Sequence, residues 1–431
     1  MAGLNDVPGL QALAVPAVCS LIAFLAYFPQ YLLRYSSLEP GPPSRRETSL
    51  FNALVLLLWY TYFKTVTEDA GRFVFSDAVM EVEGNWCDRC SAPKPARAHH
   101  CRHCGRCIPK MDHHCPWTTN CVSMTTFPHF LRFLVFSNLS LWMLANLLWQ
   151  RFAALWEARH LPAFLGPTLP ALVGLTMCAL VCLVASLALA IMLITTTKNW
   201  LYNCTTIEGW QLERHEAMLE RGGRDWWGLH DADGKKVRIE RVEFPYDLGF
   251  FTNMSQAMGT SNVILWLLPF CPGPKVGENG TGTGWDWEEN GFNRKKGMWP
   301  PVDPDKAQRA NRVWPAARRD FAAELRHVEA TVEDHKRMLR ERQRREAEQD
   351  TLAELDQVDG YDSADEHDQL GNFEDIAAWR NTDGETLRDY GVDEDAERYV
   401  SQTPSEDDDI PISELIRRRR TMRYEDVKLP S

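Results

Sequence analysis

The chain has 431 residues, a formal net charge of −12 and a mean hydropathy of −0.34, which are the averages of an acidic soluble protein of two or three domains. The residue distribution excludes a uniform soluble chain, because residues 10–200 hold long apolar runs, residues 198–345 are mixed and rich in Trp, and residues 346–409 are acidic. That last window holds 23 Asp and Glu and three Arg, a local net charge of −20. The rest of the chain therefore carries +8, and the acidic balance describes only the tail.

Four apolar segments lie before residue 200, at 10–33, 49–66, 130–152 and 171–197. About 20 mostly apolar residues cross the ~30 Å hydrocarbon layer, and a spanning segment satisfies its backbone as a helix. The alternative for each segment is a buried core helix, which the 27-residue length of the fourth argues against. The first ten residues contain no Lys or Arg, which argues against a cleaved signal peptide. The pattern predicts four transmembrane helices.

The distribution of Lys and Arg predicts how these helices are oriented. Loop 67–129 contains seven of them, loop 153–170 contains one, and the region from Lys198 onward contains many more. Positive loops stay in the cytosol, so we expect loop 67–129, the C-terminal region and both termini there. That reducing compartment also suits free thiols and zinc ligands better than disulfides.

Residues 87–121 carry seven of the twelve cysteines and five of the twelve histidines. They contain the pattern C-x2-C-x9-H-x6-C twice, with the second copy offset by 14 residues. The first set is Cys87, Cys90, His100 and Cys107, and the second is Cys101, Cys104, His114 and Cys121. Three sulfurs and one imidazole make a closed tetrahedral zinc site. The repeat predicts two structural Zn²⁺ ions.

The two sets leave Cys115 unclaimed, because its equivalent in the first copy, Cys101, belongs to the other set. A thiolate is the reactive form of cysteine, and a neighbouring imidazole lowers its pKa. His113 can take the thiol proton and return it, and Asp112 can orient that imidazole. Pro116 favours an extended backbone at the thiol. We therefore expect Cys115 to be a nucleophile.

Other interpretations of this stretch stay open from the residues alone. Cysteine-rich zinc modules often bind nucleic acid or protein, but a loop of about 60 residues tethered to the bilayer at both ends disfavours nucleic acid. A membrane-anchored zinc scaffold without chemistry would not need Cys115. A thiol oxidoreductase would need a second redox-active cysteine beside it, and a buried cysteine can also be inert.

Asp112-His113-His114-Cys115 within this loop resembles the DHHC family of protein S-acyltransferases. The flanking residues Pro116, Trp117, Asn120 and Cys121 also match, while Ser123 stands where the family often has Gly. Thr205-Thr206-Ile207-Glu208 after the fourth span resembles a T-T-x-E motif. Asn253-Met254-Ser255-Gln256-Ala257-Met258-Gly259 resembles N-x-x-x-V-F-G, with Ala257 and Met258 departing from Val and Phe.

The resemblance implies an α-helical membrane protein with four transmembrane helices, a cytosolic zinc-binding cysteine-rich domain and a largely disordered acidic C-terminal tail. It implies a two-step palmitoyltransferase in which Cys115 accepts the acyl group of palmitoyl-CoA and passes it to a substrate cysteine. His113 is then the general base and Asp112 its partner, and Thr206 lies near Asp112. The resemblance places Trp117, Phe130 and Phe133 along the acyl chain.

The opening MAGLNDVP and the tail GETLRDYGVDE resemble filamentous-fungal, endoplasmic-reticulum members, a type implicated in chitin synthase acylation. The implied partners are the lipid bilayer and membrane proteins with cytosolic cysteines, chitin synthase among them, and no nucleic acid. We expect five regions: 1–66 with the first two spans, 67–129 with the zinc sites, 130–197 with the last two spans, 198–315 with the two short motifs, and 316–431.

The remaining segments allow coarser expectations. Residues 262–270 are too short to span a membrane, so they predict a buried helix end or a segment lying on the membrane. Residues 316–349 predict a charged helix, and the acidic window 346–409 has few large apolar residues and predicts disorder.

Overall fold

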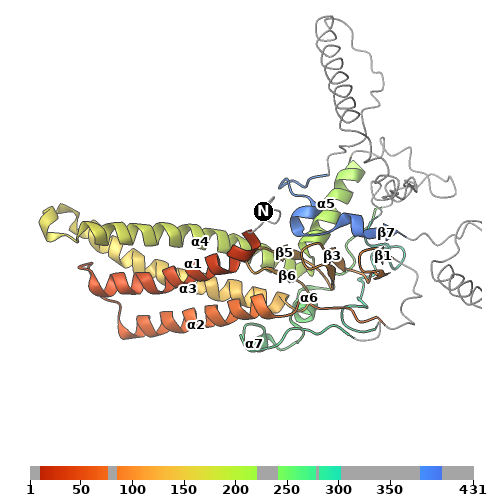
Figure 1. Ribbon diagram of the computed structural model, residues 1–431, viewed down its shortest axis with the longest axis horizontal. Helices are drawn as coiled ribbons and strands as arrows, with labels where there is room; N and C mark the ends of the chain where they lie inside the picture. Colours follow the sequence, from red (N-terminus) through yellow and green to blue (C-terminus); the bar gives the residue numbers. More distant parts are fainter. Residues whose placement is uncertain (1–9, 76–84, 221–240, 278–280, 302–378, 400–431) are drawn as a thin grey trace, which may run out of the picture. The chain divides into compact units, whose positions relative to one another are not determined.

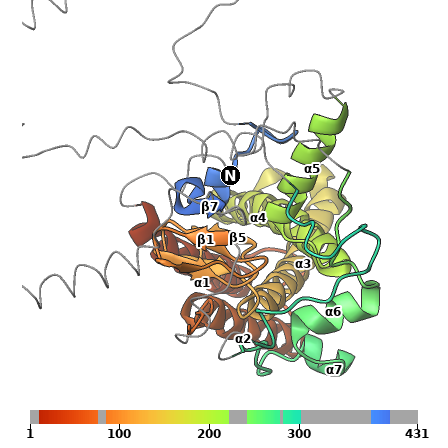
Figure 2. The same cartoon turned by 90° about the vertical axis from the view of Figure 1, so that its right-hand side faces the viewer.

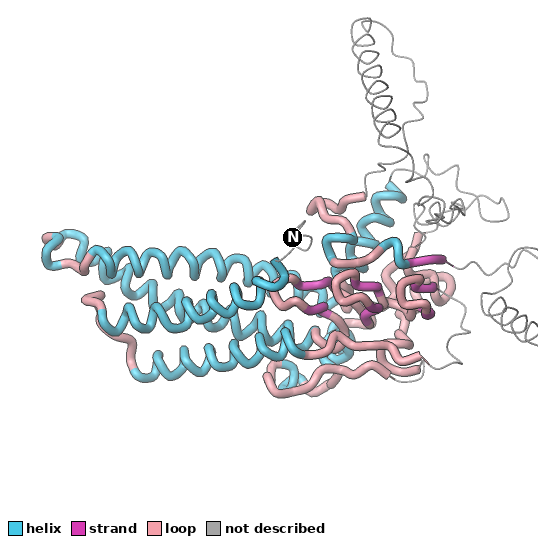
Figure 3. The backbone as a smooth tube through the Cα atoms, viewed as in Figure 1, coloured by secondary structure: helices cyan, strands magenta, loops and turns pink. Residues whose placement is uncertain are grey.

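The computed structural model describes residues 10–75, 85–220, 241–277, 281–301 and 379–399, which all belong to one compact unit of the chain. Four long helices lie side by side, and short strands and further helices gather at one end of them (Figures 1 and 3). The long helices are α1 (Leu10–Tyr35), α2 (Arg45–Thr67), α3 (Phe127–Glu157) and α4 (Leu169–Tyr202).

Within the described residues, four helices are long and apolar enough to cross a membrane, as the sequence predicts. All four extend past the predicted apolar segments, because polar end turns continue the helix. At the start of α2, for example, the Ser44 hydroxyl accepts from the Glu47 N–H at 3.2 Å, and the Glu47 carboxylate accepts from the Ser44 N–H at 2.8 Å. This reciprocal capping satisfies backbone donors that a helix otherwise leaves unpaired.

The long helices pack through buried apolar side chains and leave an apolar outer surface. Phe51 of α2, Leu144 of α3 and Leu175 of α4 are at most 2% exposed and belong to one cluster. On α4, Leu187 and Ile194 are 62% and 69% exposed. An exposed apolar face of this length suits contact with lipid.

Six short strands and a seventh from the C-terminal region form three small sheets (Figure 2). They are β1 (Asn85–Cys87), β2 (Ala92–Pro93), β3 (His99–Cys101), β4 (Arg106–Ile108), β5 (His113–Cys115), β6 (Asn120–Val122) and β7 (Glu397–Tyr399). The sheets are β2-β1-β7 and the hairpins β3-β4 and β5-β6, all antiparallel.

The elements α5 (Thr206–Glu220), α6 (Phe250–Met258), α7 (Val263–Trp266) and the 3-10 helices η6 (Leu387–Tyr390) and η7 (Glu394–Ala396) lie around these sheets and the adjoining helix ends. The 3-10 helices η3 (Ala158–His160) and η4 (Ala163–Leu165) connect α3 to α4 at the other end of the bundle (Figure 1). Buried Arg132 of α3 donates to the carbonyls of Leu265, Trp266 and Cys271, so the 262–270 segment is tied to α3. In this segment Trp266 is buried and Ile264 is 80% exposed.

The loosely matching NMSQAMG segment forms α6 and packs well despite its departures from the family pattern. Asn253 is fully buried and donates to the Leu201 carbonyl and the Asp247 carboxylate, at 2.8 and 2.7 Å. Ala257 and Met258 are buried in a cluster with residues of α3 and α4. Ala257 and Met258, in place of the Val and Phe of the family pattern, therefore still fill the space between this segment and the membrane helices.

The prediction of disorder for residues 346–409 is wrong for one part of that window. Residues 379–399 form η6, η7 and β7, and they bury Leu387, Val392 and Ala396 at 1% exposure or less. Three spaced apolar residues are enough to anchor a short segment on the surface of another part of the chain. The average composition of a long window does not reveal such isolated residues. The predicted helix 316–349 and the rest of the window lie outside the described residues.

Candidate active site and metal centres

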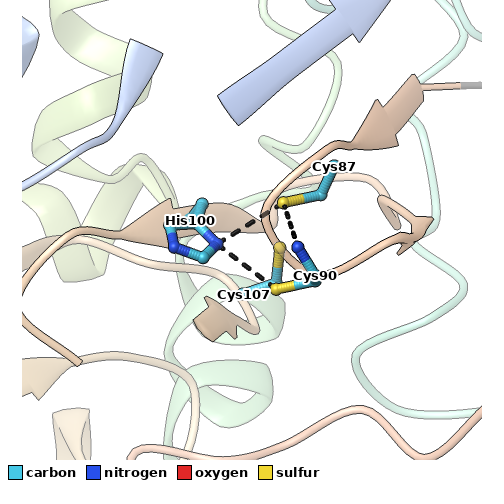
Figure 4. Close-up of side chains that lie close together, drawn as sticks. All are labelled: Cys87, Cys90, His100 and Cys107. Atoms are coloured by element: carbon cyan, nitrogen blue, oxygen red, sulfur yellow. Dashed lines mark hydrogen bonds between the residues drawn. The ribbon is translucent and has the colours of Figure 1, made fainter. Parts of the chain in front are cut away.

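The first predicted metal set comes together from three strands and a turn. Cys87 ends β1, Cys90 follows it in the turn, and His100 and Cys107 face each other across β3 and β4. The His100 Nδ1 atom lies 3.4 Å from the Cys87 sulfur and 3.3 Å from the Cys90 sulfur (Figure 4). All four ligand atoms lie within 4.8 Å of one another.

The second set repeats this arrangement with Cys101, Cys104, His114 and Cys121. The His114 Nδ1 atom lies 3.5 to 3.6 Å from the three sulfurs. All described cysteines are free thiols, so the three sulfurs are not joined by disulfides. Sulfurs gathered this closely around an imidazole nitrogen fit a metal ion with bonds of about 2.3 Å to sulfur. Each set can therefore hold one metal ion, with all four tetrahedral positions filled by protein.

Cys115 lies one residue beyond His114 on β5 and takes part in neither set. Beside it, His113 Nδ1 lies 2.6 Å from the Asp112 carboxylate, and the His113 imidazole interacts electrostatically with the Cys115 thiol. The three side chains therefore form a chain of carboxylate, imidazole and thiol. This is the order that activates a nucleophile.

The electrostatics of this chain favour an ion pair. Burial opposes the charged imidazolium, but the hydrogen bonds and charges of Asp112 and Cys115 outweigh it and raise the pKa of His113 to about 10. Burial likewise opposes the Cys115 thiolate, but the His113 hydrogen bond and charge outweigh it and hold the pKa of Cys115 below its usual value. Both shifts favour a thiolate next to an imidazolium.

The start of α5 holds Asp112 in place. The Thr206 N–H donates to the Asp112 carboxylate at 2.8 Å, and the Thr206 hydroxyl donates to the Asp112 backbone carbonyl at 2.5 Å. The structure thus places Thr206 beside Asp112, where the family resemblance puts it. One oxygen of the carboxylate contacts Thr206 and the other contacts His113, so the carboxylate orientation is defined from two sides.

Glu208, two residues further along α5, contacts the other zinc-binding repeat. Its carboxylate accepts two hydrogen bonds from the Arg97 guanidinium, at 2.6 and 2.7 Å, and both side chains are at most 2% exposed. Burial opposes the charge of Glu208, but Arg97 outweighs it and holds the Glu208 pKa below its usual value. The first turn of α5 therefore binds both repeats, through Thr206 to the second and through Glu208 to the first.

The thiol faces the helix bundle. Cys115 belongs to an apolar cluster with Ile22 of α1, Tyr62 of α2, and Phe130 and Phe133 of α3, and α4 packs against it. The Tyr62 and Phe133 ring centroids are 5.3 Å apart, and the Tyr62 hydroxyl donates to the Trp117 carbonyl at 3.0 Å. The structure therefore brings two of the three predicted acyl-chain contacts, Phe130 and Phe133, to the thiol.

Trp117, the third predicted contact, is 39% exposed and is not among the buried members of that cluster. The Trp117 backbone carbonyl accepts a hydrogen bond from the Tyr62 hydroxyl, and this bond connects the β5–β6 hairpin to α2.

Sequence reasoning missed several residues that hold this site. Asn203 caps α4 in the left-handed conformation, with φ at 53°. Its side chain accepts from Lys110 at 2.5 Å and donates to the Tyr246 carbonyl, and its backbone carbonyl accepts from Arg97 at 2.5 Å. A polar residue such as Asn203 shortly after an apolar run is the available sequence signal for such a contact. The sequence does not identify its partners, because they lie far away along the chain.

Comparison with known proteins agrees with this geometry. Residues 80–213 match the family model described as DHHC palmitoyltransferase. A protein of Gibberella zeae named Palmitoyltransferase PFA4 is 54% identical over 435 residues, covering 98% of this chain and 99% of that protein. A Neurospora crassa protein named Palmitoyltransferase pfa4 is 44% identical over 96% of both chains. A Saccharomyces cerevisiae protein named Palmitoyltransferase PFA4 is 28% identical over 89% of this chain and 97% of that one.

This similarity extends over almost the full length of the fungal relatives and decides between the three hypotheses of scaffold, oxidoreductase and acyltransferase. The chain therefore belongs to the DHHC palmitoyltransferase family, and its activity is protein S-palmitoylation.

Proposed function

We propose that Cys115 carries the acyl group during this reaction, with His113 as general base and acid and Asp112 as the residue that orients it. The observation that supports this assignment is the joint placement of the thiol. Cys115 lies at the end of the Asp112–His113 hydrogen bond and at the apolar cluster formed by all four long helices. A reactive thiol at a lipid-like surface suits an acyl donor with a long hydrocarbon chain.

In the first step, the Cys115 thiolate attacks the carbonyl carbon of palmitoyl-CoA. The new carbon–sulfur bond forms as the bond to the coenzyme A sulfur breaks, and His113 gives its proton to the departing coenzyme A thiolate. The acyl group is then held on Cys115 as a thioester. Asp112 stabilises the imidazolium form that precedes this proton transfer.

In the second step, the thiol of a substrate cysteine gives its proton to neutral His113 and attacks the same carbonyl carbon. The Cys115 thiolate leaves and the imidazolium again pairs with it. Both steps exchange one thioester for another, so they need no oxidant or reductant.

The two Cys3His sets would each hold a structural Zn²⁺ ion. Since all four positions are protein ligands, neither site offers a place for substrate. The role of His114 is to fix the backbone one residue before the thiol.

The acyl chain would extend from Cys115 between the helices, along Phe130 and Phe133, with Trp117 near its carboxyl end. Each buried methylene contributes about 0.8 kcal/mol, so a palmitoyl chain supplies much of the binding free energy. The position of the thiol among the helix ends supports this path.

We further propose that the enzyme works in the endoplasmic-reticulum membrane with both termini in the cytosol, on membrane proteins with cytosolic cysteines such as chitin synthase. The start of α1 packs against the cluster around Cys115, and α4 leads directly into α5, so both chain ends leave the bundle at the end that carries the zinc sites. The positive charge of loop 67–129 supports a cytosolic placement of that end.

The proposal is tested by incubating purified enzyme with labelled palmitoyl-CoA and measuring hydroxylamine-sensitive label on the protein. We expect wild type to take up one label, and Cys115→Ser to take up none while it keeps two zinc ions. Label on Cys115→Ser at the wild-type level would refute the assignment. Organelle-marker imaging of a tagged chain tests the compartment.

A further inference from the structure

Residues 379–399, which we call the C-terminal clamp, contact α5 with their first half. The Trp379 ring packs edge-on against Trp210, with centroids 5.0 Å apart. The Trp210 indole N–H donates to the Glu385 carbonyl at 3.1 Å, and the Thr382 N–H donates to the Glu213 carboxylate at 2.8 Å. The clamp therefore binds the helix whose first turn holds Asp112.

The second half of the clamp binds strands of the zinc sites by backbone hydrogen bonds. β7 pairs with β1, the strand that ends in Cys87, and the Asp393 N–H donates to the carbonyl of His100 at 2.9 Å. The Arg102 N–H donates to the Gly391 carbonyl at 3.1 Å, next to Cys101. The clamp thus adds a strand and further backbone hydrogen bonds to the segments that carry ligands of both metal sets.

Apolar packing follows the same path. Leu387 and Val392 are 1% exposed and share a cluster with Cys101 and Cys121 of the second set, and Ala396 is fully buried beside Cys87 and Cys107 of the first. The clamp therefore packs against cysteines of both metal sets.

Gly391 brings the clamp against the residue before the reactive thiol. Its φ is +86°, and a Cβ at this position would lie 2.7 Å from the Cβ of His114. A glycine is needed there for two separate reasons, since the left-handed backbone disfavours other residues and no space exists for a side chain. The backbone of the clamp therefore lies in direct contact with the His114 side chain of β5.

We propose that the C-terminal clamp is a positioning element of the acyl-transfer site, which holds the hairpin β5–β6 against α5 and the membrane helices so that Cys115, His113 and Asp112 stay aligned. This inference rests on the proposed role of Cys115. It assigns a function in catalysis to an acidic segment that follows residues 302–378, far from the motifs in sequence.

The first test compares Gly391 with a glycine outside the clamp. Gly391→Ala places a methyl group against His114, whereas at Gly291, with φ at +78°, a Cβ would meet no atom within 4 Å. Both substitutions strain a left-handed backbone position, and only the first also meets His114. We expect Gly391→Ala to slow the labelling of Cys115 by palmitoyl-CoA about tenfold, in line with the typical effect of overpacking, and Gly291→Ala to change it less than twofold.

The second test displaces the clamp in the full-length chain and then restores it. Val392→Asp buries a charge and should release the clamp, and we expect the acylation rate to fall at least as far as with Gly391→Ala. A synthetic peptide with the sequence of residues 379–399 should restore the rate. A tethered segment acts at or below about a millimolar effective concentration, so the peptide is supplied in that range. The same peptide carrying Val392→Asp is the control and should not restore it.

These measurements separate the inference from the wider assignment. If wild type is not acylated, the role of Cys115 fails; if wild type is acylated and Val392→Asp is as fast, the clamp has no positioning role. Equal losses in both glycine variants would overturn the contact with His114. Zinc loss from Val392→Asp that the peptide does not reverse would make the clamp a folding element only and would also overturn the proposal.

Discussion

The hairpins β3–β4 and β5–β6 are two copies of one unit, and only the second carries the thiol that we propose as the nucleophile. In the first copy His100 pairs with Cys107, and in the second copy His114 pairs with Cys121 at the same place in the ladder. The pairing of the two strands is therefore the same in both copies. It cannot be the reason that their thiols differ.

The copies differ in the residue that precedes the two histidines and in the use of the following cysteine. The second copy has Asp112 where the first has buried Ala98, so the second imidazole gains a carboxylate partner from the residue directly before it. Cys101 is claimed by the second metal set, while Cys115 has no later set to join. When the metal-binding unit is duplicated in this overlapping way, the last copy therefore keeps one cysteine that belongs to no metal set.

The surroundings complete the difference. Cys101 is buried among zinc ligands and beneath Leu387 of the C-terminal clamp, whereas Cys115 faces Ile22 and Phe130 of the membrane helices. The same hairpin position thus holds a metal-set cysteine in the first copy and, on our proposal, the nucleophile in the second. What a residue contacts decides between the two uses.

The largest difference between the two hairpins is expected when the equivalent cysteines, Cys115 and Cys101, are each exchanged for serine. We expect Cys115→Ser to abolish thioester labelling and to retain two zinc ions, and Cys101→Ser to lose one zinc ion and to unfold at lower denaturant concentration, because metal binding and folding are coupled in such sites. Metal analysis and labelling of the same preparations measure both. Loss of zinc from Cys115→Ser would show that the two positions have the same role.

Removing the charge of Asp112 should make the second copy resemble the first. Asp112→Asn keeps the shape of the side chain but no longer stabilises the imidazolium, so we expect the acylation rate to fall roughly 10²- to 10⁴-fold with zinc content unchanged. Asp69→Asn, at a 53% exposed carboxylate of the same region, is the matched control and should stay within about twofold. A rate for Asp112→Asn near wild type would remove the carboxylate from the mechanism.

The ion pair of Glu208 with Arg97 tests how α5 connects the copies. Glu208→Gln leaves the buried guanidinium without its counter-charge, and we expect a loss of about 3–5 kcal/mol in the free energy of unfolding. The double variant Arg97→Met with Glu208→Gln should recover part of this loss, since no charge is then buried alone. Glu68→Gln, in the partly exposed pair with Lys64, should cost less than about 1 kcal/mol in the same unfolding experiment.

Of the changes to the second copy, Thr206→Val is expected to have the smallest effect on the acylation rate. Thr206→Val removes the hydroxyl bond to the Asp112 carbonyl and keeps the backbone bond to its carboxylate, so we expect a five- to tenfold lower acylation rate, the effect of about 1–1.4 kcal/mol for one hydrogen bond. Thr205→Val removes the bond to the Glu208 N–H and should affect stability more than rate. Equal rate losses in both variants would argue that Thr206 acts only through the fold of α5.

The long helices and the two metal sets were predictable because each follows from local chemistry. A run of apolar residues forms a helix wherever lipid surrounds it, and the spacing C-x2-C-x9-H-x6-C names all eight ligands without knowledge of the fold. The unclaimed thiol followed by subtraction, and the adjacent Asp112 and His113 indicated its chemistry. These predictions need only neighbours within about 20 residues.

Contacts between distant segments were not predictable in this way. Arg97 and Glu208 are 111 residues apart, and each looks like an ordinary surface charge when read alone. The C-terminal clamp lies in a window whose composition predicts disorder, yet Leu387, Val392 and Ala396 find a surface that already exists. Composition measures whether a segment can form its own core and cannot register a core supplied by another part of the chain.

The sequence by itself determined the membrane spans, the members of both metal sets and which sulfur these sets leave unclaimed, because periodicity and ligand spacing act over short distances along the chain. Only the tertiary structure decided that α5 joins the two repeats, that the thiol faces the helix bundle and that residues 379–399 pack against both metal sets. Those features depend on which surfaces meet, and burial of charge and apolar area there is a property of the assembled fold rather than of any one segment.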